Sequence, residues 1–195
     1  MPGPFSFTDA CYPIGMEIAL AYVDTEVFPI PAGWIAVGHL DGGPTVLAFD
    51  PARIPHSVRD GAATPLDPAV VNPLLAGAIE AAATRLWVEG WSFALAESFA
   101  INRRALQRDR LAKSTLHPNI LRTLAAVSEG PDAEGMGRIL RALAAYATSY
   151  GEGHAVLDRI DDAGRVARNA IEALRQVHTG RPIRPEPEDR DKSKD

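Results

Sequence analysis

The sequence has a single cysteine, Cys11, among its 195 residues. One thiol cannot form a disulfide within the chain, and it cannot supply a zinc site made of several cysteines. No apolar run approaches the roughly 18 residues that a membrane-spanning helix needs. The N-terminal stretch lacks the basic segment followed by an apolar one that marks a secretory signal. We therefore expect a cytoplasmic protein that has no membrane partner.

The motifs of several large enzyme classes are missing as well. There is no Gly-x-Gly-x-x-Gly, no Walker loop, no His-Glu-x-x-His and no Cys-x-x-Cys. The first three patterns bind dinucleotides, nucleotide phosphates and metal ions, and the last one forms a redox-active dithiol. Because no catalytic constellation and no cofactor loop can be assembled from the residues, we expect no cofactor. We favour a non-enzymatic accessory or regulatory protein that acts through protein–protein association, including association with itself.

What is present indicates an ordinary globular chain, with 46% hydrophobic and 23% charged residues. Residues 1–66 predict β-structure and connections. Apolar runs occupy 16–23, 34–40 and 45–49, and Asp41-Gly42 separates the last two. Asp-Gly between two apolar runs indicates a hairpin, because glycine tolerates the positive φ that the turn needs. We expect a three-stranded antiparallel meander, with His56 and Ser57 in a loop after it.

Residues 67–180 follow a helical pattern that begins at Asp67-Pro68, a capping residue followed by proline in the first turn. We expect about five helices, at 68–89, 92–113, 118–129, 133–150 and 154–178. The helical region is expected to form one domain with the meander. Residues 181–195 hold five basic and five acidic residues and one apolar side chain, Ile183. Such a tail cannot offset the entropy of ordering, so we expect it to be disordered. The predicted fold class is α+β, with the meander packed on a C-terminal bundle of about five helices.

The charge is unevenly distributed along the chain. Residues 101–125 hold six basic residues against one acid, Asp109, whereas residues 1–60 hold seven acids against two arginines. Within the first of these stretches lies the basic segment, residues 103–113, whose cations are Arg103, Arg104, Arg108, Arg110 and Lys113. A solvated helix face would explain it, with arginine stems lying over apolar neighbours. An acidic protein surface would also fit, supplied by another protein, by the chain's own N-terminal region or by a second copy.

Nucleic acid is a third interpretation of the basic segment. Arginine binds phosphate well, but the segment has no interleaved aromatic residue on which a base could stack. The overall charge of -5 also argues against a dedicated nucleic-acid binder. We therefore do not expect nucleic acid to be the partner.

Arg110 and His117 enclose six residues, which resembles the Arg-x(4–6)-His pattern of the helical HEPN ribonucleases. The resemblance covers eight residues, and Leu111 stands where that family usually has a polar residue. It implies that Arg110 and His117 would act on the ribose 2′-hydroxyl and the phosphate. The alternative function is thus a helical nucleic-acid-binding protein or ribonuclease that uses this pair.

His154 and Asp158 are four residues apart and would share a helix face, which makes them a candidate pair of metal ligands. A metal would need a third ligand, and the sequence nominates none. Acidic residues in a first helical turn are also favoured by the helix dipole. We therefore expect no metal site.

Overall fold

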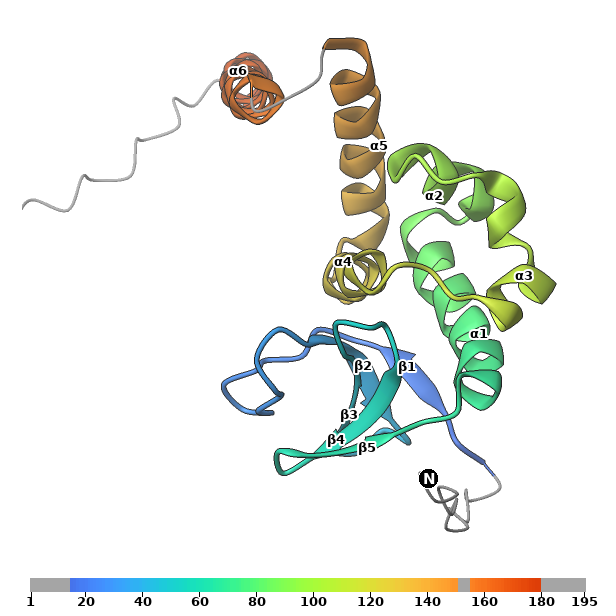
Figure 1. Cartoon of the computed structure of the whole chain (residues 1–195). Helices are drawn as coiled ribbons and strands as arrows, with labels where there is room; N and C mark the ends of the chain where they lie inside the picture. Colours follow the sequence, from blue (N-terminus) through green and yellow to red (C-terminus); the bar gives the residue numbers. More distant parts are fainter. Residues whose placement is uncertain (1–14, 151–154, 180–195) are drawn as a thin grey trace, which may run out of the picture. The chain divides into compact units, whose positions relative to one another are not determined.

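A five-stranded antiparallel sheet begins the described chain, and six α-helices follow it (Figure 1). The computed structural model describes residues 15–150 and 155–179. The chain divides into two compact units, residues 1–145 and residues 146–195. The division falls within a helix. The predicted α+β class is confirmed.

The strands lie side by side in sequence order, and each pairs antiparallel with the next. They are β1 (Ile18–Leu20), β2 (Ile35–Leu40), β3 (Thr45–Phe49), β4 (Pro55–Arg59) and β5 (Ala62–Pro65). The three predicted strands are present, but the prediction that the meander stops at three is wrong. His56 and Ser57, which we expected in a loop, lie within β4.

Two Asp-Gly turns connect these strands. Asp41 and Gly42 have φ angles of 55° and 61° between β2 and β3, so the predicted positive φ of Gly42 is confirmed. Asp60 and Gly61 repeat the pattern between β4 and β5, with φ angles of 51° and 77°. The second hairpin escaped prediction because its strands, PHSVR and AATP, contain few apolar residues. All four residues of β5 are exposed at the edge of the sheet, where burial imposes no apolar pattern.

Two of the predicted helix starts, at Asp67 and His117, are marked by a capping side chain. The elements are α1 (Pro68–Leu86), α2 (Trp91–Ser98), a 3₁₀ turn η1 (Arg103–Leu106), α3 (Arg108–Lys113), α4 (Pro118–Ser128), α5 (Ala133–Tyr150) and α6 (Ala155–Thr179). Asp67 Oδ1 accepts a hydrogen bond from the Ala69 amide at 2.9 Å and so caps α1. None of the described helices combines the length and apolar character that crossing a bilayer requires.

The prediction of a single helix at 92–113 is wrong, because the structure has α2, η1 and α3 there. The predicted bundle of about five helices is wrong for the same reason. The chain leaves α2 through Ala100, whose φ of 51° is left-handed, and the Ile101 amide donates to the Ala96 carbonyl at 2.9 Å. This is the geometry of a helix C-terminal cap. The break allows η1 and α3 to bury Leu106 and Leu111 separately, at 3% and 1% exposure.

The main core lies between one face of the sheet and the helices of the first unit. From the sheet it includes Val37, Leu47 and Phe49, and α1 and α4 pack against the first two strands. The opposite face of the sheet has its own smaller cluster, in which Phe28 and Trp34 cover Val46 and other strand residues. Both faces are therefore covered. Of the elements that carry the basic segment, α3 packs on α1, and η1 packs on α2 and α3.

Candidate binding surface

The basic segment lies on two short elements of the first unit. Arg103 and Arg104 belong to η1, and Arg108, Arg110 and Lys113 belong to α3. All five are exposed. Within the part of the chain that the structure describes, none of them forms an ion pair. Gln107 ends η1 and begins α3, so the chain bends there and forms a corner between the two elements. The five cations lie along this corner instead of on one face of a single helix.

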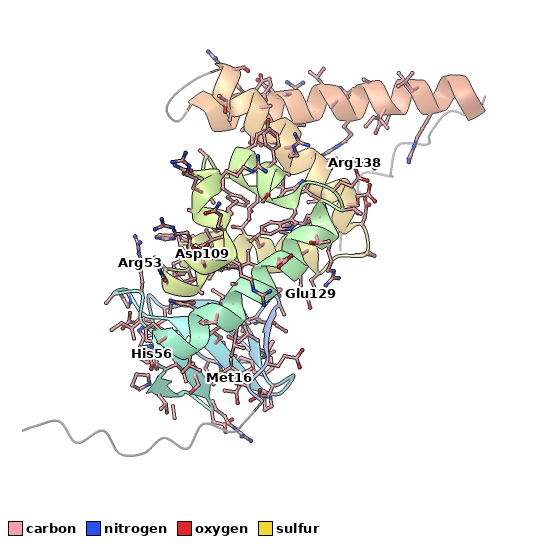
Figure 2. All side chains as sticks on the ribbon, turned by 90° about the vertical axis from the view of Figure 1, so that its right-hand side faces the viewer. Met16, Arg53, His56, Asp109, Glu129 and Arg138 are labelled. Atoms are coloured by element: carbon pink, nitrogen blue, oxygen red, sulfur yellow. The ribbon has the colours of Figure 1, made fainter. Side chains whose placement is uncertain are left out.

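Asp109 is the acid within this corner, and it is exposed as well (Figure 2). The acidic residues of the first 60 that the structure describes make no ion pair with the basic segment. Two of them accept hydrogen bonds from backbone amides in the sheet region: Asp41 from Glu17 at 2.8 Å, and Asp50 from Ile54 at 2.8 Å. The positive charge of the corner thus faces solvent.

A wide hollow of about 570 Å³ borders η1. Arg103 and Arg104 line it together with Trp91 and Leu106, and Ser92, Asn102 and Gln107 complete it. The basic segment itself contains no aromatic residue. The fold brings Trp91 there from the start of α2, where it is half-buried. The hollow therefore offers an apolar wall beside two cations.

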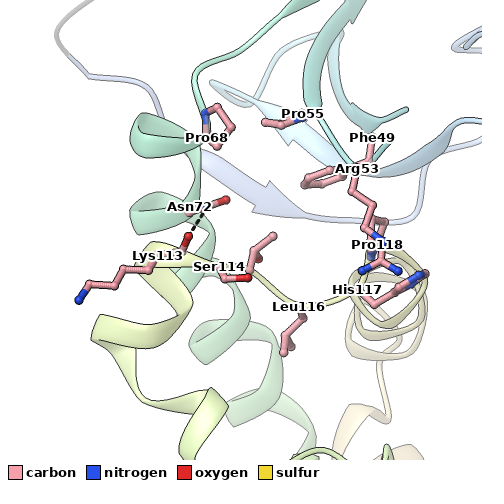
Figure 3. A pocket seen from close by; sticks show the side chains of 11 residues that line it. Phe49, Arg53, Pro55, Pro68, Asn72, Lys113, Ser114, Leu116, His117 and Pro118 are labelled. Atoms are coloured by element: carbon pink, nitrogen blue, oxygen red, sulfur yellow. Dashed lines mark hydrogen bonds between the residues drawn. The ribbon is translucent and has the colours of Figure 1, made fainter. Parts of the chain in front are cut away.

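A smaller hollow of about 170 Å³ lies at the other end of the segment (Figure 3). Its walls come from the sheet, from the start of α1 and from the link between α3 and α4. In Figure 3 the Arg53 side chain extends from the sheet toward His117, whereas the Lys113 side chain points away. The lining residues are Phe49, Arg53, Pro55, Pro68, Asn72 and the run from Lys113 to Pro118. No carboxylate is among them.

The polar groups of this hollow are partly engaged. Asn72 is 7% exposed, and its amide nitrogen donates to the Lys113 carbonyl at 3.5 Å. Thr115 Oγ1 is buried and has no hydrogen-bond partner among the described residues. His117 Nδ1 accepts from the Asn119 amide at 3.2 Å, which caps α4. In this arrangement the hydrogen of a neutral imidazole is on Nε2, so His117 can donate to a ligand.

The pair proposed from the ribonuclease resemblance is placed unfavourably for that chemistry. Arg110 is exposed on α3 and is not among the residues that line the hollow with His117. A general base needs a free nitrogen lone pair within reach of the proton that it takes. The lone pair of His117 Nδ1 is used by the cap, and the imidazole is fixed by the helix that it begins.

The candidate metal pair, His154 and Asp158, is only partly within the described residues. His154 lies outside the described residues, and Asp158 is exposed in the first turn of α6. Across residues 15–150 and 155–179, no group of three or more potential ligands lies close enough to hold a metal ion.

Three residues of the smaller hollow were missed from the sequence, namely Arg53, Asn72 and Thr115. Arg53 lies in the connection between β3 and β4, 64 residues away from His117 in the chain, and the tertiary fold places both at this hollow. Its φ of 65° is unusual for a residue other than glycine, but no motif announces it. One local feature of the sequence points to this hollow, namely the His117-Pro118 start of α4.

Comparison with protein-family models, with curated proteins and with solved structures finds no match to this chain. What the chain can do must therefore be inferred from its own surfaces.

Proposed function

We propose that this chain is a non-enzymatic accessory or regulatory protein of the cytoplasm, and that it binds an acidic protein surface through the basic segment. One observation carries the proposal. Five cations are exposed on η1 and α3, and none forms an ion pair among the described residues. A corner with this charge attracts an acidic partner at long range and favours the correct orientation of docking.

The two hollows support contact at closer range. Trp91 and Leu106 offer apolar area beside Arg103 and Arg104. At the other end, Arg53 and His117 can donate hydrogen bonds to a carboxylate, and Phe49 and Pro55 add apolar contact. Interfaces gain most from aromatic and arginine side chains at such positions. An acidic segment with a few apolar side chains fits this surface best.

A nucleic acid is the second candidate, and Trp91 is the observation that favours it. A base could stack on an indole whose neighbours, Arg103 and Arg104, bind the phosphates. We rank it second because Trp91 is half-buried and the whole chain carries a net charge of -5. A ribonuclease function would also need a general base, and His117 Nδ1 is already used to cap α4.

Charge reversal tests the proposal. The change Arg103→Glu, Arg104→Glu and Arg108→Glu should abolish capture of an acidic protein from the native cell. Each exposed substitution should change the free energy of unfolding by less than about 0.5 kcal/mol, so the fold should survive. Capture is measured by affinity purification with mass spectrometry, and the binding constant by titration of the purified pair.

The matched control is Arg59→Glu, Arg85→Glu and Arg138→Glu, three exposed arginines outside the basic segment with the same total change in charge. This control should retain the partner. Direct titration with RNA, single-stranded DNA and duplex DNA separates the two candidates, because salt weakens both kinds of complex. Micromolar RNA binding, or RNA cleavage that is lost in His117→Ala, would replace the protein partner with the second candidate.

A further inference from the structure

Helix α6, in the second unit, carries an apolar face on which several large side chains are exposed. On α6 the side chains of Val166, Ile171 and Leu174 are 62%, 54% and 58% exposed. A helix gains most of its stability in proteins from packing its apolar face, because forming the helix alone is only marginally favourable. The 25 residues of α6 therefore need a partner surface.

The apolar residues of α6 follow a heptad pattern. Five of them recur at alternating steps of three and four residues, and Val166 and Ile171 flank the same stripe. The five are Ile160, Ala163, Ala167, Ala170 and Leu174. Residues at this spacing form the seam along which two helices pack as a coiled coil. Alanines in the middle of the seam allow the two backbones to approach closely. The stripe fits another long helix better than it fits a flat surface.

The charges of α6 are divided between its two halves. Residues 155–164 contain three aspartates and one arginine, a net charge of -2. Residues 165–179 contain three arginines and one glutamate, a net charge of +2. Two copies side by side in the same direction would place like charges together. In opposite directions, the acidic half of each copy lies beside the basic half of the other.

We propose that α6 is a self-association surface, and that it pairs antiparallel with α6 of a second copy of this chain. The heptad seam supplies the apolar contact, and the divided charge selects both the partner and its direction. The opposed helix dipoles favour the same direction. This surface is distinct from the basic segment, so the proposal does not depend on the binding of an acidic partner.

Sedimentation velocity of the full chain, over a concentration series, tests the association. We expect a monomer–dimer equilibrium with a dissociation constant of about micromolar order. Leu174→Asp should weaken it at least tenfold, because it places a charge in the seam. Asn169→Asp adds the same charge on the polar side of α6 and should leave it unchanged. A chain that stays monomeric up to about 100 μM would overturn the proposal, and so would equal effects of the two variants.

Charge exchange tests how the partner is selected. Asp161→Lys with Asp162→Lys makes both halves of α6 basic and should weaken the dimer at least tenfold. Adding Arg168→Glu and Arg175→Glu reverses the polarity of the helix and should restore dimerisation to near the original level. If the four changes together do not restore it, charge does not select the second copy, and the proposed pairing is wrong.

Cross-linking tests the direction. In a Cys11→Ser background, Asp161→Cys and Arg175→Cys are made as separate proteins and treated with a short bismaleimide. Antiparallel pairing predicts efficient cross-links only when the two proteins are mixed, because residues 161 and 175 then lie near each other across the dimer. Efficient cross-linking of either protein with itself would show a parallel dimer and would exclude the proposed arrangement.

Discussion

The helices α1 and α6 have comparable lengths, 19 and 25 residues, and opposite surroundings. In α1, Leu75, Ile79 and Leu86 are fully buried between the sheet and other helices. In α6, Ile171 and Leu174 are more than half exposed. Both helices carry a regular apolar pattern. The pattern therefore predicts that a helix forms and which side it buries, but it does not say whether the covering surface comes from the same chain.

The contrast separates two kinds of stability within one protein. The free energy of the first unit comes from a core that the chain completes by itself. If α6 pairs with a second copy as proposed, it should gain stability with protein concentration by mass action. The three tryptophans, Trp34, Trp87 and Trp91, all belong to the first unit, so their fluorescence reports its unfolding alone.

The largest effect is expected in the core of α1. Leu75→Ala should lower the free energy of unfolding of the first unit by about 2–5 kcal/mol, since it removes a fully buried side chain and leaves a cavity. Denaturant titration followed by tryptophan fluorescence measures it. Val70→Ala, at an exposed position of α1, is the control and should change the value by less than about 0.5 kcal/mol. Equal losses in the two variants would show that α1 is not packed as described.

An intermediate loss of stability is expected from a substitution at Gly137, with Gly164 as the control. A Cβ on Gly137 of α5 would collide with the Leu86 carbonyl at the end of α1, where Trp87 Nε1 donates to the Gly137 carbonyl at 2.9 Å. Gly137→Ala should therefore cost about 1–3 kcal/mol in the same titration. Gly164→Ala in α6 meets nothing within 4 Å and should leave the first unit unchanged. A neutral Gly137→Ala would mean that α5 lies farther from α1.

Local signals account for the parts of the fold that were predicted. The hairpin at Asp41-Gly42 and the helix starts at Asp67 and His117 follow from residues whose side chains or φ preferences act within a few positions. The break after α2 could not be predicted in this way. It occurs at Ala100, an alanine in the left-handed region where glycine is usual, and it is stabilised by the burial of Leu106 and Leu111 far from the turn itself.

The candidate surface could likewise be predicted only where it depends on residues that are close together in the sequence. Each cation of the basic segment could be named from the sequence, because charge density is a local property. Their neighbours could not, because Trp91 and Arg53 reach the surface through the packing of α2 and the pairing of the strands. Only the three-dimensional structure shows that His117 Nδ1 is engaged at a helix start, which is what weakens the ribonuclease interpretation.

The smallest effect is expected from Leu174→Ala, the counterpart of Leu75→Ala in α6. Both changes remove the same atoms, but Leu174 is 58% exposed and belongs to the second unit, so the first unit should change in stability by less than about 0.5 kcal/mol. The effect should appear instead in self-association, measured by sedimentation velocity, because the seam of α6 loses contact area there. A loss of more than about 1 kcal/mol in the tryptophan titration, with unchanged sedimentation, would show that Leu174 packs within its own chain. The second unit would then be held by the first, and the distinction between a self-sufficient core and a helix that requires a second copy would no longer hold.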